Sequence, residues 1–289
     1  MCRGGIYLSR RSRRRLVTAK LKAEPEAGSR ALRSPDFVGI GRTAQIAVHS
    51  WTQNEDKTRR TDVQEDLTVF LGHFGVGFGA KAAAPKASLG TLFLAAQFVD
   101  LLWPTFLLVG LEKVVITPGI TRVTPLDFTD YPITHSLIAS IVWAALFAGA
   151  YFLMRKYPKG AWICGAAVLS HWVLDLLTHR PDLPLVPGGA AKVGLGLWNS
   201  LPATLVVELG IFAVGVWLYV RTTRALDRTG TTALWSLVGF LLIIYFSNLF
   251  GPPPPSAMAV AWLGHAQWLL VIWAFWIDRH RVAGHSIEY

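Results

Sequence analysis

Six apolar segments, each near the length that an α-helix needs to cross a bilayer, constrain this chain more than any other feature. Hydrophobic residues make up 52% of the sequence and charged residues only 16%, a composition that soluble domains rarely have. The segments are residues 89–111, 135–154, 161–178, 200–220, 233–250 and 257–277. The sequence therefore predicts an all-α, polytopic transmembrane helical bundle with about six full spans.

A shorter apolar stretch precedes these spans. Residues 67–80 are too short for an ordinary span, and their four glycines allow close approach between helices. We expect a short N-terminal or re-entrant helix that turns near Pro85 and pairs with the first span. His73 and Asp100 would then lie at similar depth, with a kink or early helix end at Pro104 bringing Asp100 outward.

The ends of the chain are polar. Residues 1–66 carry 14 Lys or Arg against 8 Asp or Glu and have no apolar run, which is typical of a disordered tail. An alternative is that this tail is a gene-model extension and that translation starts near Leu67. The tail lacks aromatic residues interleaved with its arginines, so it does not predict nucleic-acid binding. The helical membrane domain then comprises residues 67–281, followed by a C-terminal tail of residues 282–289.

Basic residues near the span ends alternate between two sides. Four lie on one side: Lys113, Arg122, Arg180 and Lys192. Ten lie on the other side: Lys81, Lys86, Arg155, Lys156, Lys159, Arg221, Arg224, Arg228, Arg279 and Arg281. Because short cytoplasmic loops are enriched in Lys and Arg, we predict a multi-pass protein with a cytoplasmic C-terminus. Six tryptophans at span ends are expected in the aromatic belt at the membrane interface: Trp103, Trp162, Trp198, Trp217, Trp235 and Trp276.

Several ionisable residues lie within or beside the spans, where each costs at least a few kcal/mol unless it faces a cavity, a partner or an ion. His171, Asp175 and His179 follow at four-residue steps and would form one stripe on a helix. Imidazole and carboxylate groups are ligands for Zn²⁺, and also for Mn²⁺ or Fe²⁺. We predict a divalent metal, with Zn²⁺ the expected one, bound by His73, Asp100, His135, His171, Asp175 and His179.

Packing roles are the alternative for these polar residues, because buried polar groups commonly bond to each other. His171 and Asp175 alone would fit that interpretation as well as a metal site. His265 stands alone on an aromatic face, so we expect a packing role for it. Glu208, in the fourth span, is a candidate for orienting a ligand side chain.

The candidate ligands resemble the motifs of a known family, the bacterial membrane-bound metal-dependent hydrolases. That family is similar in having a His in a first short helix, an Asp near the end of the next helix, a Thr-His-Ser at a span start and a Ser-His-x-x-x-Asp-x-x-Thr segment. The matching residues here are His73, Asp100, Thr134-His135-Ser136, Ser170-His171, Asp175 and Thr178. The resemblance covers roughly residues 67–200 and implies a protein of the bacterial inner membrane.

The chain also departs from the family's pattern. The family often has a second Asp and a His after the first Asp, where this chain has Leu101 to Pro104, and a Gly-His-Arg-Gly where this chain has residues 129–133. His179 and Asp182 are candidate substitutes. Because the family's metal site is similar to that of zinc-dependent phospholipases C, the resemblance implies a phosphoester or lipid substrate.

The leading hypothesis is hydrolysis at a metal ion near the outer membrane face, because a bound metal lowers the pKa of its water ligand. Asp100 or Asp175 would act as general base and Arg180 would stabilise an anionic oxygen. The alternatives are a proton-coupled permease that uses Asp100, Asp175 and Glu208, or a non-catalytic membrane scaffold. No inverted repeat is visible, although transporters commonly show one.

Overall fold

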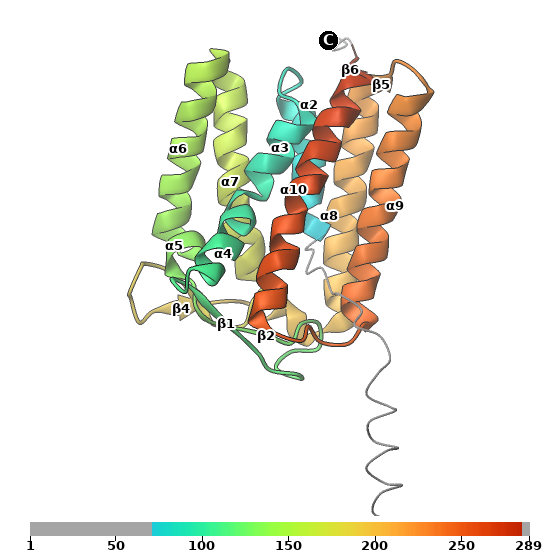
Figure 1. Cartoon of the computed structure of the whole chain (residues 1–289). Helices are drawn as coiled ribbons and strands as arrows, with labels where there is room; N and C mark the ends of the chain where they lie inside the picture. The colour runs from blue at the N-terminus through green and yellow to red at the C-terminus, as the bar shows by residue number, and fades with distance from the viewer. Residues whose placement is uncertain (1–70, 285–289) are drawn as a thin grey trace, which may run out of the picture. The chain divides into compact units, whose positions relative to one another are not determined.

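The computed structural model describes residues 71–284 of the 289-residue chain. The predicted basic tail, residues 67–70 and residues 285–289 lie outside the described residues. Within the described part, five helices are long and apolar enough to cross a membrane. They are α6 (Leu137–Arg155), α7 (Pro158–Thr178), α8 (Leu201–Thr222), α9 (Arg228–Phe250) and α10 (Ala257–Arg279). Figure 1 shows α6 and α7 on one side and α8, α9 and α10 on the other, with α2 and α3 between them. The predicted all-α membrane bundle is confirmed.

The first predicted span is not one helix. α3 (Leu89–Ala96) and α4 (Phe98–Leu108) meet at Gln97 with a bend of 54°, and together they would make a sixth crossing. The expectation placed the kink or helix end at Pro104, whereas the bend lies at Gln97 and Pro104 lies inside α4. The break precedes Pro104 by about two helical turns. Asp100 consequently lies in the first turn of α4, where a carboxylate is favoured by the helix dipole.

The short helix predicted before the spans is present as α2 (Leu71–Ala83). It is joined to α3 by a tight turn, in which Lys81 Nζ donates a hydrogen bond to the carbonyl oxygen of Ala87 at 2.6 Å. α2 packs against α3, α7 and α8. Its closest approach is to α8, because Gly75 lies against the backbone of Ile211 and Phe212. α2 is therefore a buried central element that brings His73 into the bundle.

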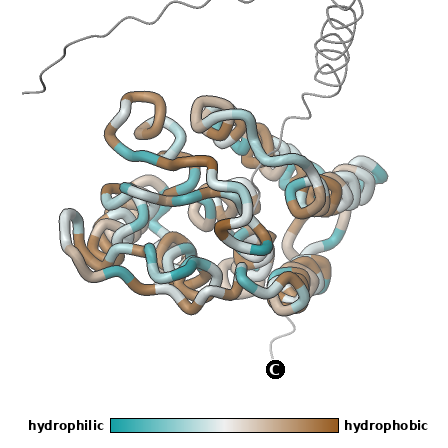
Figure 2. The backbone as a smooth tube through the Cα atoms, turned by 90° about the horizontal axis from the view of Figure 1, so that it is seen from below, coloured by the Kyte–Doolittle hydropathy of each residue, from teal (hydrophilic) through white to brown (hydrophobic). Residues whose placement is uncertain are grey.

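One end of the bundle is covered by irregular and extended segments. β1 (Lys113–Ile116) pairs antiparallel with β2 (Leu126–Asp130), and β3 (Leu183–Pro184) pairs with β4 (Lys192–Val193). Two helical turns were not predicted, α5 (Pro132–His135) and the 3₁₀ turn η1 (Leu197–Asn199). We call this end the hairpin end; it is the lower end in Figure 1 and the near side in Figure 2, where hydrophilic stretches alternate with hydrophobic ones.

The hairpin end covers a buried aromatic cluster that includes two of the tryptophans expected at the membrane interface. Trp103 and Trp198 are only 6% and 2% exposed, and they pack with Phe128, Tyr131 and Leu183 beneath β1 and β2. Their assignment to the aromatic belt was wrong, because the covering segments separate them from the surface. Both residues contribute instead to the apolar surroundings of the candidate site.

The opposite end carries the helix ends rich in basic residues. α6, α8 and α10 finish there with Arg155, Arg221 and Arg279, and β5 (Thr223–Ala225) pairs with β6 (Arg281–Ala283). We call it the basic end, the upper end in Figure 1. The separation of basic residues along the bundle therefore follows the predicted alternation.

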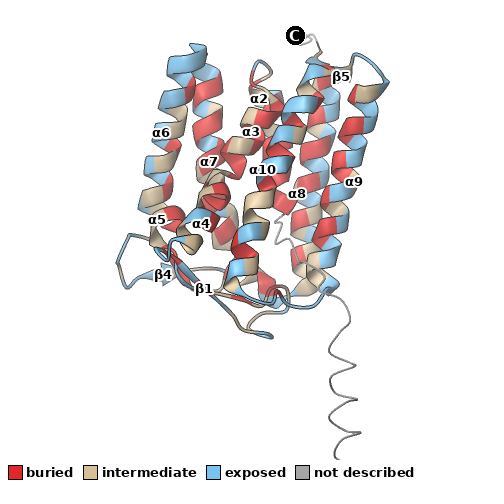
Figure 3. Ribbon diagram, in the orientation of Figure 1, coloured by how far each residue is buried: buried red, intermediate tan, exposed pale blue. Residues whose placement is uncertain are grey.

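The outer faces of the long helices are apolar and exposed. Leu153 of α6, Val206 of α8, Ile243 of α9 and Leu269 of α10 are each at least 66% exposed. Figure 3 shows α2 and α3 mostly buried at the centre and α6 mostly exposed. A soluble protein rarely exposes so many large apolar side chains in contiguous patches. The arrangement is that of a multi-pass membrane protein.

Candidate metal centre

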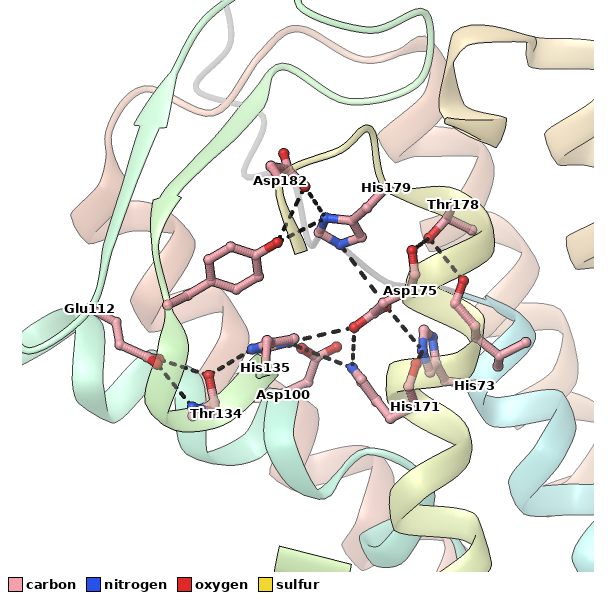
Figure 4. Close-up of polar contacts among 12 residues, drawn as sticks. His73, Asp100, Glu112, Thr134, His135, His171, Asp175, Thr178, His179 and Asp182 are labelled. Carbon is pink, nitrogen blue, oxygen red and sulfur yellow. Dashed lines mark hydrogen bonds and ion pairs between the residues drawn. The ribbon is translucent and has the colours of Figure 1, made fainter. Parts of the chain in front are cut away.

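The structure brings all six predicted ligands into one buried cluster near the hairpin end (Figure 4). Each of the six is at most 6% exposed. Four elements and one cap position supply them: His73 from α2, Asp100 from α4, His135 from α5, His171 and Asp175 from α7, and His179 as the residue that caps α7. Residues as far apart in the sequence as His73 and His179 thus lie in one cluster.

Asp100 faces two histidines. Its Oδ1 lies 3.2 Å from His135 Nε2 and 3.4 Å from His171 Nε2. Asp175 faces the same pair from the other side, since its Oδ2 lies 3.5 Å from His171 Nε2 and 3.8 Å from His135 Nε2. Two imidazole nitrogens and two carboxylate oxygens therefore face a common centre.

The second oxygen of Asp175 faces the remaining histidines. Its Oδ1 lies 3.4 Å from His73 Nε2 and 4.0 Å from His179 Nε2. The ring of His73 also packs against that of His171, with centroids 3.9 Å apart, and its Nε2 lies 3.4 Å from the His171 carbonyl oxygen. Asp175 thus lies between two pairs of histidines and contacts all four.

These separations are compatible with metal ligation. Most of them are longer than the 2.7–3.2 Å that is typical of N–H···O bonds. Two ligand atoms bound to a tetrahedral zinc ion at about 2.1 Å lie about 3.4 Å apart. The spacing of Asp100 Oδ1 from His135 and His171, 3.2 and 3.4 Å, is close to that edge. The donor set therefore suits a divalent cation.

The tautomer of His171 supports the same conclusion. Its Nδ1 lies 2.9 Å from the carbonyl oxygen of Ala96. A carbonyl oxygen only accepts hydrogen bonds, so Nδ1 carries the proton. In the neutral ring Nε2 then presents a lone pair toward the carboxylates of Asp100 and Asp175. This arrangement is repulsive unless the ring is protonated or a cation lies between these groups.

His135 is oriented by a relay that ends on a buried carboxylate. Its Nδ1 lies 2.6 Å from Thr134 Oγ1, and that hydroxyl donates to Glu112 Oε2 at 2.7 Å. Glu112 Oε1 accepts two further bonds, from the backbone nitrogens of Ile133 and Thr134. Because the hydroxyl proton points to Glu112, Nδ1 of His135 donates to the hydroxyl oxygen. Nε2 of His135 therefore faces Asp100 within the cluster. In metal sites, a ligating histidine likewise donates its other ring N–H to a group outside the ligand set.

His179 shows the same arrangement at the rim. Its Nδ1 lies 3.0 Å from Asp182 Oδ1, and the Tyr131 hydroxyl donates to the same oxygen at 3.2 Å. Burial and the Asp182 carboxylate raise the pKa of the Tyr131 phenol, so this hydroxyl keeps its proton and remains a donor. Asp182 therefore lies behind His179 and orients it.

Arg180 lies at the edge of this network. Its Nε donates to Asp182 Oδ2 at 2.9 Å, and its guanidinium also pairs with Asp127. The side chain is 34% exposed. Arg180 therefore contacts the cluster only through Asp182, the carboxylate that orients His179.

Two other predicted residues lie apart from the cluster. Glu208 Oε2 accepts a hydrogen bond from the backbone nitrogen of Leu71 at 3.0 Å, so it caps the helix that carries His73. His265 is bonded through Nδ1 to the carbonyl oxygen of Ala261 and through Nε2 to Thr105 Oγ1. The expected packing role of His265 agrees with these contacts.

A small cavity adjoins the cluster. It measures about 20 Å³ and touches Asp100, His135, Asp175 and His179, with Trp103 and Phe128 among its apolar walls. This volume is enough for about one water molecule. The cluster thus has room for one small exchangeable group beside the ligands.

Glu112 and Tyr131 were missed by the sequence reasoning. Both are 1% exposed, yet both lie in the connection between two predicted spans. The only available signal for Glu112 was an acidic residue close to a span end, which solvated loops carry equally often. Their roles depend on how β1 and β2 fold back over the cluster.

Among the described residues, two sets of ligands lie close enough to hold a metal ion: His73, His171 and Asp175, and Asp100, His135 and His171. Comparisons of the chain with family models, with curated proteins and with solved structures find no match. The conclusion that these buried groups could hold a metal ion therefore rests on the geometry of the site.

Proposed function

We propose that the chain is a membrane-embedded metal-dependent hydrolase of the bacterial inner membrane, with its site near the outer face. One observation carries the proposal. His135, His171 and His179 each commit Nδ1 to an outer acceptor and turn Nε2 toward the carboxylates of Asp100 and Asp175. A neutral imidazole held in this tautomer presents a lone pair to a carboxylate, and a cation bound between the two groups would relieve the repulsion.

The inner set of ligands would be Asp100, His135, His171 and Asp175, with His73 and His179 on the far oxygen of Asp175. Zn²⁺ is the expected metal, because imidazole and carboxylate ligands in a compact buried set are typical of it. When bound, such an ion lowers the pKa of a water ligand to near neutrality. The carboxylates of Asp100 and Asp175 would neutralise its charge.

The protein groups would then position and deprotonate water. Asp100 and Asp175 both border the cavity of about 20 Å³, so either can accept a proton from a group held there. Trp103 and Phe128 keep bulk water away from the same space. Arg180 would reach an anionic oxygen only after releasing Asp127. A phosphoester or lipid substrate is proposed from the motif resemblance.

The test is the metal content of the full chain purified in detergent, measured by mass spectrometry of the elements. The wild type should contain at least one equivalent of zinc, and His171→Ala should lose most of it because two carboxylates lose their shared partner. His265→Ala is the matched control, since this histidine contacts Ala261 and Thr105 away from the cluster. It should retain the wild-type metal content.

The proposal would be contradicted if His171→Ala and the wild type had the same metal content. It would also be contradicted if the wild type contained no metal after growth with zinc. Metal-free protein would favour the permease or scaffold alternatives, neither of which requires stoichiometric metal. Hydrolysis of bis-p-nitrophenyl phosphate by the metal-loaded wild type, absent in His171→Ala, then tests the reaction itself.

A further inference from the structure

A second cavity lies at the basic end, far along the bundle from the metal centre. It measures about 750 Å³ and opens between α6 and α10, with α3 at its base. Its volume falls within the range of ligand-binding cavities. We call it the basic groove. None of its lining residues belongs to the candidate metal site.

The mouth of the basic groove is cationic. Lys86 and Arg155 line it, both are exposed, and neither forms an ion pair with an acidic side chain among residues 71–284. Lys86 Nζ lies 5.8 Å from the ring centre of Tyr157. Two cations without acidic partners at one opening produce a field that attracts an anion.

The other charged residues of the groove are already neutralised or bonded. Lys81 pairs with Asp278 at 3.6 Å, and Asp278 also accepts a bond from the backbone nitrogen of Gly90. Arg281 donates to Thr223 and to the carbonyl oxygen of Gly230. These contacts form the rigid end of the groove. Lys86 and Arg155 have no acidic partner within residues 71–284, although Arg155 also contacts the Tyr151 side chain.

The depth of the groove is apolar. Leu94, Phe147, Ala150, Met154 and Phe275 line it. Met154 is 74% exposed and Phe275 is 39% exposed on helices that face the membrane. A flexible thioether and an aromatic ring suit a ligand of variable shape. The groove therefore combines an anion-attracting mouth with an apolar side opening, at the level of the helix ends.

We propose that the basic groove binds one anionic glycerophospholipid. Its phosphate would lie against Lys86 and Arg155, and its acyl chains would lie against Phe147, Met154 and Phe275. Basic pockets between transmembrane helices are suited to anionic head groups. The proposal rests on the membrane fold and is independent of the metal centre.

Native mass spectrometry of the full chain in detergent tests this. Phosphatidylglycerol should bind more tightly than phosphatidylcholine with the same acyl chains. The double variant Lys86→Gln with Arg155→Gln should weaken phosphatidylglycerol binding by about 25-fold, because each cation near a membrane surface contributes about 5-fold. The control, Lys159→Gln with Arg224→Gln, removes two exposed cations outside the groove and should bind as the wild type does.

A second pair of variants tests the acyl-chain part. Ala150→Phe should fill the groove and reduce phosphatidylglycerol binding, whereas Ala145→Phe, exposed on the same helix outside the groove, should not. Equal binding of the two lipids, or unchanged binding by the double variant, would overturn the proposal. Competition by glycerol 3-phosphate as strong as that by the lipid would overturn it too, since a free phosphate would then be the ligand.

Discussion

His135 is oriented by Thr134, whose side chain is not one of the candidate metal ligands. Thr134 accepts from the imidazole and donates to Glu112, so one hydroxyl both sets the tautomer and orients the ring. Glu112 is 1% exposed and receives three hydrogen bonds from residues 133 and 134. A fully bonded buried carboxylate is a stable anchor for such a relay.

Replacing Thr134 by Val should therefore weaken metal binding without removing a ligand. We expect roughly a 10–100-fold loss of zinc affinity, the usual effect of losing an outer partner of a ligating histidine. Competition with a chromogenic chelator measures it. Thr129→Val is the control, because the Thr129 hydroxyl donates to the carbonyl oxygen of Lys113 on the same hairpin, away from the cluster. Equal affinities in the two variants would show that the relay has no influence on the site.

The residues of the cluster could be identified from the sequence because ionisable groups are rare within apolar segments and each requires an explanation. His179 was only partly understood. The predicted stripe assumed a helix through residue 179, but α7 ends at Thr178 and His179 has extended backbone angles. Its Nε2 is the most distant from Asp175, at 4.0 Å. Glu112 could not be predicted, because only the tertiary fold shows that it is buried.

The break between α3 and α4 contributes directly to the site. Carbonyl groups in the last turn of a helix lack partners within that helix. Because α3 ends at Ala96, its carbonyl oxygen can accept the bond from His171 Nδ1. The bend also places Asp100 in a new first turn that faces α7. A straight helix over residues 89–111 would provide neither contact.

Close packing of α2 on α8 positions His73, and glycine makes this packing possible. A Cβ atom at Gly215 would lie 2.0 Å from the carbonyl oxygen of Gly75, a clash with backbone that side-chain motion cannot relieve. Gly215→Ala should therefore lower the thermal unfolding temperature in detergent, by overpacking that costs about 1–3 kcal/mol. Displacing α2 should also reduce zinc affinity.

Gly210→Ala is the matched control on the same helix, because nothing lies within 4 Å of the added Cβ. Its unfolding temperature should equal or exceed that of the wild type, since Ala favours helix more than Gly does. An unfolding temperature of Gly215→Ala as high as that of Gly210→Ala would contradict the close packing of the two helices.

Hydropathy predicted the long helices well because a bilayer demands about 20 apolar residues and satisfies no backbone group. Hydropathy predicted the local structure less well where other segments of the chain shield the backbone from the membrane. The break at Gln97 lies among packed helices, and the short helix α5 and the turn η1 lie at the covered end of the bundle. There, contacts with β1, β2 and the aromatic cluster decide the local structure, and no periodic pattern indicates them.

At the scale of the whole molecule, the two ends of the bundle have different chemistry. The hairpin end covers the ligand cluster, and the basic end carries the helix termini with Arg155, Arg221 and Arg279. If the bent pair α3 and α4 counts as one span, six crossings bring the turn before α3 and the C-terminal strand β6 to the same side. Five crossings would place them on opposite sides.

Single-cysteine labelling in intact cells can decide both the number of crossings and the orientation. With Cys2 and Cys164 replaced by Ala, Val115→Cys on β1 should react with a membrane-impermeant maleimide, because the hairpin end is expected to face outward. Lys159→Cys and Lys86→Cys, at the basic end, should react only after permeabilisation. Reaction of Lys86→Cys from outside together with protection of Lys159→Cys would mean that α3 and α4 do not cross. Protection of Val115→Cys with free reaction of both lysine positions would reverse the bundle and place the metal centre at the cytoplasmic face.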